Sequence, residues 1–146
     1  MFQKQFFSPD EKKAIVSAIA EAEAMTSGEI RVHIEPRCKH DNPVHRAHEV
    51  FYKLGMDKTT NANAVLIYIA HDDRKFAIIG DKGINQVVPA NFWEGTKEAM
   101  REHFKRGEFY QGVVFAIRET GSHLKQYFPH APGESKNELS NEISEG

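Results

Sequence analysis

The chain has almost no cysteine, no long apolar run and no large excess of charge of either sign. Cys38 is the only cysteine among the 146 residues, so no intrachain disulfide can form and a reducing compartment is expected. The longest apolar run, Ala64 to Ala70, is far shorter than the roughly 20 residues of a membrane-spanning helix. Met1 to Phe7 contains neither an apolar segment nor a cleavage site typical of a signal peptide. We therefore expect a cytoplasmic protein without a membrane partner.

The charge pattern also excludes a class of partner. The net charge is −2, and no basic stripe with interleaved aromatic residues is present, which argues against nucleic acid binding. A hydrophobic content of 40% and a charged content of 27% are typical of one globular domain of this length. We predict this domain over residues 1–130. The polar, acidic tail of residues 131–146 is predicted to be disordered, because its larger apolar residues are only Leu139 and Ile143.

Helix and strand signals alternate along the first half of the chain. Ser8-Pro9-Asp10-Glu11 has the form of a capping box, and the apolar residues after it recur at helical spacing until Gly28. Residues 30–34 alternate between apolar and polar, as in a strand with one buried and one polar face. Asn42-Pro43 can begin a second helix, which ends at Gly55. Residues 64–70 are apolar throughout, as expected for a central strand.

The second half begins with a hairpin and continues as helices. The turn of residues 71–74 returns the chain into an antiparallel strand over Lys75 to Ile79. A third helix carrying Trp93 then ends at Gly107, and a fourth ends near Phe128-Pro129. Two strands joined through a helix form a right-handed parallel unit, and helices lie before and after the sheet. The sequence therefore predicts a three-layer α/β/α sandwich, Rossmann-like, with a small mixed sheet.

This topology brings three polar segments to one end of the sheet. They precede the first strand, precede the second strand and follow the third strand. Their side chains offer carboxylate and amide oxygens, which are ligands of Ca²⁺ and Mg²⁺. The predicted ligands of a divalent cation are Glu29, Asn61, Asn63 and Asp81. In the alternative interpretation Glu29 pairs with Lys58 or Lys82, and the asparagines only shape turns.

The same segments carry a resemblance to a known family. Residues 26–32, 58–68 and 80–84, together with Phe92-Trp93-Glu94 and Phe128-Pro129, resemble the TPM domain family of thylakoid lumen, photosystem repair and receptor-modulator proteins. The resemblance covers residues 7–129. It implies a Rossmann-like α/β/α sandwich, divalent-cation binding and, for some plant members, acid phosphatase activity.

One segment after the third predicted strand matches the family pattern, and the next departs from it. Asp81 stands in the Gly-Asp-Lys-Gly form of bacterial members, whereas Gly83-Ile84-Asn85 replaces the Gly-Leu-Glu of photosynthetic members and so lacks one carboxylate. Asp81 and Glu29 are therefore the leading predicted ligands. If the domain is a phosphomonoesterase, Asp81 would act with the cation while Lys82 or Lys58 balanced the charge of the phosphate. No Asp-x-Asp phosphatase motif is present.

Two other places in the chain are weaker candidates. Asp72 and Asp73 lie at the hairpin tip, near the carboxyl end of the first strand, where open α/β sheets often bind ligands. Zinc could be held by thiolate and imidazole groups, although their spacing matches no standard zinc module. The side chains concerned are Cys38, His40, His45 and His48. Trp93 is expected to anchor a helix to the sheet rather than to line a pocket.

Three functions remain open at this point. The first is a metal-assisted acid phosphatase acting on a phosphorylated small molecule. The second is a non-catalytic module in which Ca²⁺ or Mg²⁺ orders the loops of residues 56–63 and 80–88 to bind a protein partner. The third is a structural adaptor without a cation. Phosphatase assays and melting in chelator would separate the three.

Overall fold

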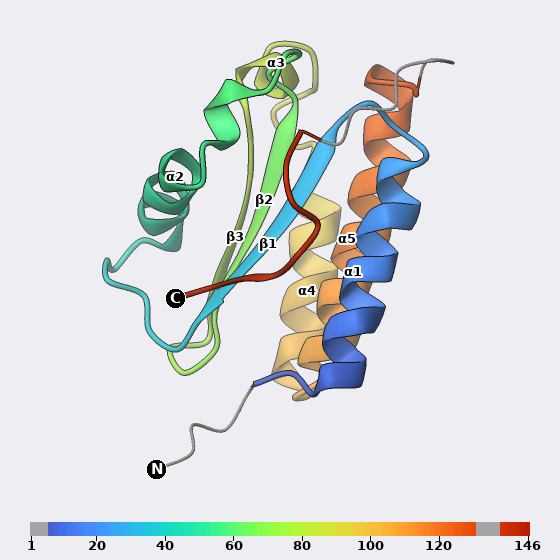
Figure 1. Cartoon of the computed structure of the whole chain (residues 1–146). Coiled ribbons are helices and arrows are strands. Elements are labelled where there is room, and N and C mark those ends of the chain that lie inside the picture. Colours follow the sequence, from blue (N-terminus) through green and yellow to red (C-terminus); the bar gives the residue numbers. More distant parts are fainter. Residues whose placement is uncertain (1–5, 131–137) are drawn as a thin grey trace.

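The computed structural model describes residues 6–130 and 138–146, and places a sheet between two layers of helices (Figure 1). The elements alternate as the sequence predicts, and their order along the chain is helix, strand, helix, strand, strand, helices and a short last strand. The bounds are α1 (Pro9–Glu23), β1 (Glu29–Glu35), α2 (Pro43–Lys53), η1 (Met56–Lys58), β2 (Ala64–Ala70), β3 (Lys75–Gly80), α3 (Lys82–Asn85), α4 (Glu94–Lys105), α5 (Phe109–Tyr127) and β4 (Ser144–Glu145).

Both N-terminal capping signals form as predicted. The Ser8 hydroxyl accepts the Glu11 N–H (3.1 Å), and the Glu11 carboxylate accepts the Ser8 N–H (2.9 Å), so the capping box of α1 is complete. The Asn42 side chain accepts the Val44 N–H at 2.9 Å at the start of α2. These bonds satisfy N–H groups that have no partner within a helix, which fixes where each helix begins.

The sheet has the order β3-β2-β1-β4. β1 and β2 pair in parallel from Glu29↔Ala64 to Glu35↔Ala70, and β2 and β3 pair antiparallel. The predicted parallel unit through α2 and the predicted hairpin are therefore confirmed. Two consequences matter for the site. The start of β1, the start of β2 and the end of β3 lie at one end of the sheet, and β2 is buried along its whole length.

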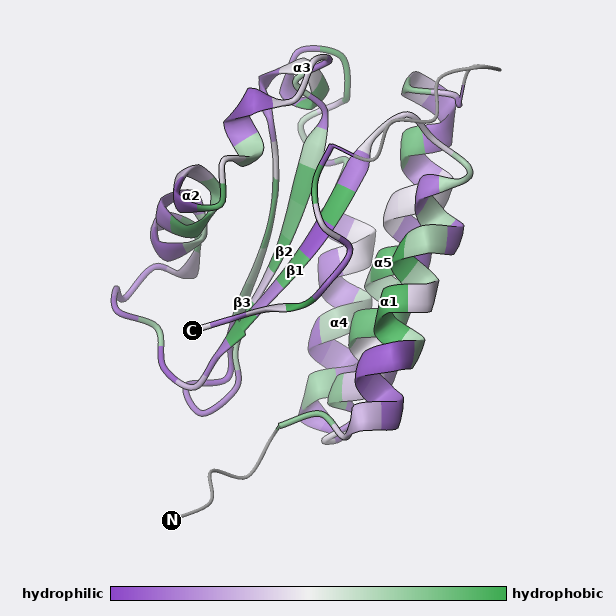
Figure 2. Ribbon diagram, in the orientation of Figure 1, coloured by the Kyte–Doolittle hydropathy of each residue, from purple (hydrophilic) through white to green (hydrophobic). Residues whose placement is uncertain are grey.

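Helices cover both faces of the sheet, which confirms the α/β/α sandwich. α1, α4 and α5 lie on one face, and α2 lies on the other (Figure 1). Each of these helices carries buried apolar residues, and green, apolar segments are clearest in β1, β2, α1 and α5 (Figure 2). The cluster on the first face includes Ile67 and Ile117, and the cluster on the second includes Phe51 and Leu66. Within the described residues, no helix is long and apolar enough to cross a membrane.

The aromatic pair before α4 belongs to the first core. Trp93 is buried in the same cluster as Met100, and the Phe92 and Trp93 rings meet edge to face. The interpretation of Trp93 as a helix anchor is confirmed. α4 begins at Glu94, after both rings, so the predicted third helix starts later than Phe92.

Residues 138–146, here called the C-terminal strap, lie along the outer edge of β1. β4 pairs in parallel with His33 and Ile34, and the Gly146 N–H donates to the Ile34 carbonyl (2.9 Å). The ordered strap differs from the disorder that was predicted for this part of the tail. The same prediction for residues 131–137 lies outside the described residues. Backbone pairing and two apolar contacts, Leu139 with the α2-side cluster and Ile143 with the other, hold the strap.

Candidate functional site

The three predicted segments meet at the amino end of β1 and β2. Glu29 lies directly opposite Ala64 in the parallel ladder. On the other side of the same residue, the Asp81 N–H donates to the Ala64 carbonyl at 2.9 Å. Glu29 and Asp81 therefore flank Ala64 on neighbouring strands, separated by two strand spacings, which is roughly 10 Å between their Cα atoms. Only a methyl group stands between the two carboxylates along the sheet.

Asp81 has one satisfied and one unsatisfied carboxylate oxygen. It is the N-cap of α3, and its Oδ1 accepts the Lys82 N–H at 2.8 Å. Its Oδ2 is buried and has no hydrogen-bond partner within the described part of the chain. The residue is only 7% exposed. A buried carboxylate oxygen without a donor costs free energy, so a hydrogen-bond donor or a cation at Oδ2 of Asp81 would stabilise the folded protein.

Glu29 is 4% exposed and is capped by the C-terminal strap. Its Oε1 accepts the Leu139 N–H at 2.6 Å. Burial raises the pKa of Glu29 and the charge of Glu138 raises it further, whereas the N–H groups of Leu139 and Glu138 lower it. The predicted ion pairs of Glu29 with Lys58 or Lys82 are not seen among the described residues. Both lysines are exposed.

The loop before β2 reaches the turn after β3 through backbone contacts. The Gly83 N–H donates to the Ala62 carbonyl at 2.8 Å. A Cβ on Gly83 would lie 2.5 Å from the Ala62 oxygen and 2.6 Å from the Asn61 oxygen, so only glycine permits this approach. Asn61 thus brings its backbone carbonyl, more than its exposed side chain, toward the 81–83 turn.

The remaining predicted ligand is oriented away from Asp81. The amide nitrogen of Asn63 donates to the Ser27 Oγ at 3.3 Å, which directs this buried side chain toward the loop before β1. Thr59, in the loop before β2, is also buried, and its Oγ1 has no partner among the described residues. Glu29 and Asp81 therefore flank Ala64, the 61–62 carbonyls lie against the 81–83 turn, and Asn63 is engaged with Ser27.

A shallow hollow adjoins Asp81 on the α2 side. Its lining includes Asp81 and Lys82 from the 80–83 turn, His48 and Tyr52 from α2, and Asn85 from α3. Lys82 therefore belongs to the surroundings of Asp81. Lys58 lies on η1 and is not part of this lining.

The weaker candidates have local partners. The Asp73 Oδ2 accepts the Cys38 N–H at 2.7 Å, and the Asp72 Oδ1 lies 3.2 Å from His71 Nδ1, as in ordinary turn chemistry. His40 pairs with Glu49 at 3.0 Å and stacks on His45. In the described ranges, no group of three or more His, Cys, Asp and Glu side chains is placed to hold a metal, which removes support for the zinc hypothesis.

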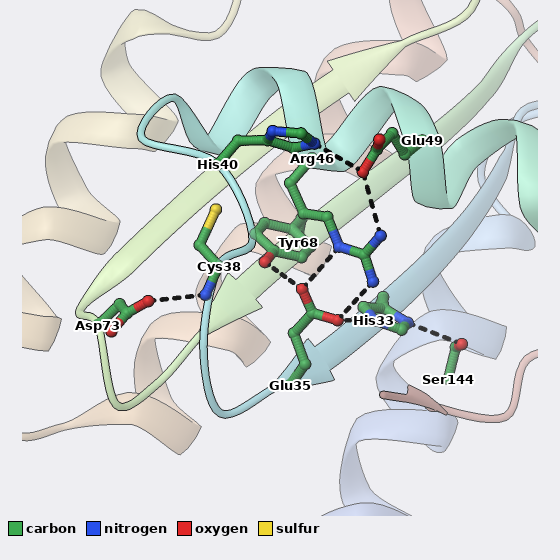
Figure 3. A network of polar contacts seen from close by, with 9 residues as sticks. All are labelled: His33, Glu35, Cys38, His40, Arg46, Glu49, Tyr68, Asp73 and Ser144. Carbon is green, nitrogen blue, oxygen red and sulfur yellow. Dashed lines mark hydrogen bonds and ion pairs between the residues drawn. The ribbon is translucent and has the colours of Figure 1, made fainter.

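A buried polar network, which the sequence did not reveal, lies at the carboxyl end of β1 (Figure 3). The Glu35 carboxylate accepts two bonds of 2.9 Å from Arg46 of α2, one from Nε and one from Nη2. The Tyr68 hydroxyl also donates to Glu35. The His33 ring lies between Glu35 (3.1 Å) and Ser144 (2.8 Å) of the strap.

The charge state of Glu35 follows from these donors. Burial alone would raise its pKa, but hydrogen bonds from Arg46, Tyr68 and His33 outweigh burial and hold the pKa at about 2. Burial lowers the pKa of His33. Every oxygen of Glu35 is thus engaged, so the network clamps α2 and the strap to the sheet and leaves no oxygen for a ligand.

The alternating pattern of β1 indicated a polar face but not its partners. His33 and Glu35 lie on that face, which is buried here by contacts with Arg46 of α2, Tyr68 of β2 and Ser144 of the strap. The prediction of helices on both faces already required this face to be covered. A carboxylate that is buried on such a face needs a hydrogen-bonding partner of opposite charge, and Arg46 of α2 is the partner of Glu35.

Comparisons with known proteins agree with this architecture. The NMR structure of the BA42 protein from the psychrophilic bacterium Bizionia argentinensis is 47% identical, covers 99% of each chain and superposes with a TM-score of 0.92. The N-terminal domain of the cg2496 protein from Corynebacterium glutamicum is 13% identical, over 89% of this chain and 79% of that one, with a TM-score of 0.65, and shares the fold. No curated protein has a significantly similar sequence.

The family model of the TPM domain matches residues 1–123. This range contains all of the β1–β3 sheet and the whole of the end at which Glu29 and Asp81 meet. The chain therefore belongs to the TPM domain family.

Proposed function

We propose that this TPM domain binds a divalent cation, Ca²⁺ or Mg²⁺, between Glu29 and Asp81 at the amino end of β1 and β2. The observation that carries the proposal is the Oδ2 atom of Asp81, which is buried without a donor. A folded protein stabilises such an oxygen with a hydrogen bond or a cation. No lysine or arginine forms an ion pair with Asp81 among the described residues, which leaves the oxygen free for an external cation.

The sheet geometry supports a shared ion. Glu29 and Asp81 occupy register positions on either side of Ala64, and side chains at aligned positions of neighbouring strands project from the same face. This face carries the α2-side core, including Ala64. Two carboxylates on one face, one of them unsatisfied, make a negative site that a single ion of charge +2 neutralises.

The chemistry of the remaining donors favours a hard cation. The backbone carbonyls of residues 61–62 lie against Gly83, two residues after Asp81, and the same loop carries the buried Thr59 hydroxyl, so the further donors that the segment offers are neutral oxygens. Ca²⁺ accepts six to eight such oxygens in a flexible arrangement, and Mg²⁺ retains several waters. Thiolates and imidazoles, which transition metals prefer, are not grouped there within the described residues.

A metal-assisted phosphomonoesterase is the second candidate. Lys82 lines the hollow beside Asp81, so a phosphate entering the hollow would meet both the cation and an ammonium group. A bound cation supplies polarisation of phosphoryl oxygens and activation of water. Asp81 would hold the cation, Lys82 would bind the phosphate, and exposed Lys58 would attract it from a distance. If this activity is absent, the cation instead orders the loops for a protein partner.

The deciding experiment is a calorimetric titration of chelator-treated protein with CaCl2 and with MgCl2. Asp81→Asn and Glu29→Gln should each weaken binding by at least roughly tenfold, since each removes a charged ligand. Asp72→Asn is the matched control, because its carboxylate is exposed at the opposite end of the sheet. Equal affinity in the parent and in Asp81→Asn would refute the site, and loss of affinity in Asp72→Asn would move it to the hairpin tip.

Hydrolysis is tested separately from binding. We expect any turnover of a phosphomonoester by the Ca²⁺- or Mg²⁺-loaded protein to disappear in Asp81→Asn and to fall in Lys82→Ala. Cation binding without turnover across acidic and neutral pH would favour the non-catalytic module.

A further inference from the structure

We infer that the C-terminal strap is a built-in competitor of the divalent cation, because its backbone N–H groups occupy the Glu29 carboxylate that the cation needs. The inference rests on the proposed function and adds a regulatory element to the same site. Docking of the strap and loading of the ion would then oppose each other within one chain.

The first contact is with Glu29 itself. The Leu139 N–H donates to Oε1 at 2.6 Å, and the Glu138 N–H also favours the charged carboxylate. These N–H groups give Glu29 the positive partner that a cation would otherwise supply. Among described residues, Asp81 has no such substitute for its Oδ2 atom, so the two proposed ligands are in different states. In the described part of the chain, Oε1 of Glu29 thus accepts an N–H of the strap, whereas Oδ2 of Asp81 accepts none.

The second contact ties the strap to the loop before β2. The Thr60 N–H donates to both carboxylate oxygens of Glu138, at 3.2 Å each. The Thr60 hydroxyl donates to Oε2 of the same carboxylate at 3.1 Å. This carboxylate is thereby held by Thr60, in the loop that precedes β2 and the Glu29–Ala64 pair. The strap therefore contacts two of the segments that border the proposed site.

The far end of the strap is held by contacts that do not involve Glu29. β4 pairs with β1, Ser144 bonds to His33 (2.8 Å), and Glu145 pairs with Lys12 of α1 (3.2 Å). Ile143 packs against the core of the α1 face. Near Glu29, only Leu139 adds an apolar contact. Release can therefore begin at residues 138–139 while β4 stays paired.

The test removes one N–H group and leaves the rest of the full chain intact. Proline has no backbone N–H, so Leu139→Pro deletes the bond to Glu29. Leu139→Val keeps both the N–H and an apolar side chain, and is the matched control. Titration of chelator-treated protein with CaCl2 should show Leu139→Pro binding roughly tenfold more tightly than the parent, as expected for one hydrogen bond to a charged group. The valine variant should stay within about twofold.

A second measurement uses the unmodified chain. In ¹⁵N relaxation experiments, saturation with CaCl2 should make the Glu138 and Leu139 amides more mobile, while the Ser144 and Glu145 amides change less. Equal Ca²⁺ affinity of the proline and valine variants, or unchanged mobility at residues 138–139, would overturn the competition. Weaker binding by Leu139→Pro would show that the strap helps to hold the ion. If the parent and both variants bind neither Ca²⁺ nor Mg²⁺, the proposed function fails and the inference with it.

Discussion

Glu23 and Glu35 are both withdrawn from water, but their hydrogen-bond partners differ. Glu35 accepts bonds from a guanidinium, a hydroxyl and an imidazole, and its pKa falls to about 2. Glu23 is half-buried, accepts a hydrogen bond from one neutral donor, the Ile30 N–H at 2.8 Å, and lies near the charge of Glu29. Burial, the largest effect, raises the pKa of Glu23 to about 7. One carboxyl group therefore stabilises the fold when ionised, and the other when protonated.

We predict that Glu23→Gln stabilises the protein above neutral pH. A folded-state pKa raised from 4.5 to about 7 means that the native state holds a proton that the unfolded state has lost. The contribution of Glu23 to the free energy of unfolding is thus lost as pH rises from about 4.5 to about 7. Glutamine keeps an acceptor for the Ile30 N–H without the charge. At pH 8 we expect a gain of about 1–3 kcal/mol in urea unfolding.

The control for this prediction is Glu21→Gln, an exposed position on the same helix. The gain in Glu23→Gln should vanish near pH 4, where the carboxyl is protonated in both states. A gain that is the same at pH 4 and pH 8 would show that charge is not the cause.

At the residue scale, the sequence predicted that Glu29 and Asp81 lie at the same end of the sheet, but not the buried network of Glu35 and Arg46. Glu29 and Asp81 could be predicted because each directly borders a strand, and strand order fixes which borders meet. The Glu35–Arg46 pair could not, because Arg46 is a charged residue beside the apolar stripe of α2, next to Ala47, and its partner depends on the rotation of that helix over the sheet. The spacing of apolar residues predicts which face of a helix is buried, but not which long polar side chain at the border of that face points toward the sheet.

Two turns form a tight contact next to the site. Gly83 fits against the Asn61 and Ala62 carbonyls, at distances that no Cβ tolerates. The same loop holds Ala62 at a φ of +50°, a left-handed conformation that costs free energy for alanine. The contact is therefore set by backbone shape rather than by side-chain polarity.

We predict that Gly83→Ala destabilises the protein by about 1–3 kcal/mol, because the added methyl group must displace backbone carbonyls that also border the proposed site. Gly95→Ala is the control, since a Cβ there meets nothing within 4 Å and the position is helical. It should be neutral or stabilising by up to about 1 kcal/mol. Chemical denaturation measures the free energy of unfolding of both variants. An unchanged value for Gly83→Ala would show that the 61–62 backbone moves aside at no cost in free energy.

Among the elements, helices and strands followed from their capping and periodicity, whereas the strap did not. Ser8 and Asn42 act locally, so their effect is visible in a short stretch of sequence. The strap is held by backbone pairing with β1, by Thr60 and by two separated apolar residues. Such contacts come from distant parts of the chain and leave no periodic pattern, so the composition alone suggested disorder.

The whole molecule is one sheet shared by two apolar clusters. β2 contributes Val65 and Ile67 to the cluster beneath α1 and α5, and Leu66 and Tyr68 to the cluster beneath α2. Neither cluster can lose its sheet without the other losing it as well. The two layers should therefore unfold as a single cooperative unit.

We predict that Phe51→Ala shifts the unfolding of both layers equally, by about 3–5 kcal/mol. Phe51 packs only in the α2-side cluster, whereas Trp93, the single tryptophan, reports on the opposite cluster. Tryptophan fluorescence and far-ultraviolet circular dichroism should give coincident curves in the parent and in the variant. A fluorescence midpoint that stays at the parent value would mean that the layers unfold separately.

The position of β4 has a consequence for solubility. β1 is an inner strand at His33 and Ile34 only because β4 pairs with it there. Earlier along the same side, the Ile30 N–H already donates to the carboxyl group of Glu23, so this N–H is not available to pair with another strand. Full departure of the strap would expose the unprotected part of this edge to neighbouring molecules. The two residues of β4 thus add little to the sheet, but they keep this edge of β1 from pairing with a strand of another molecule.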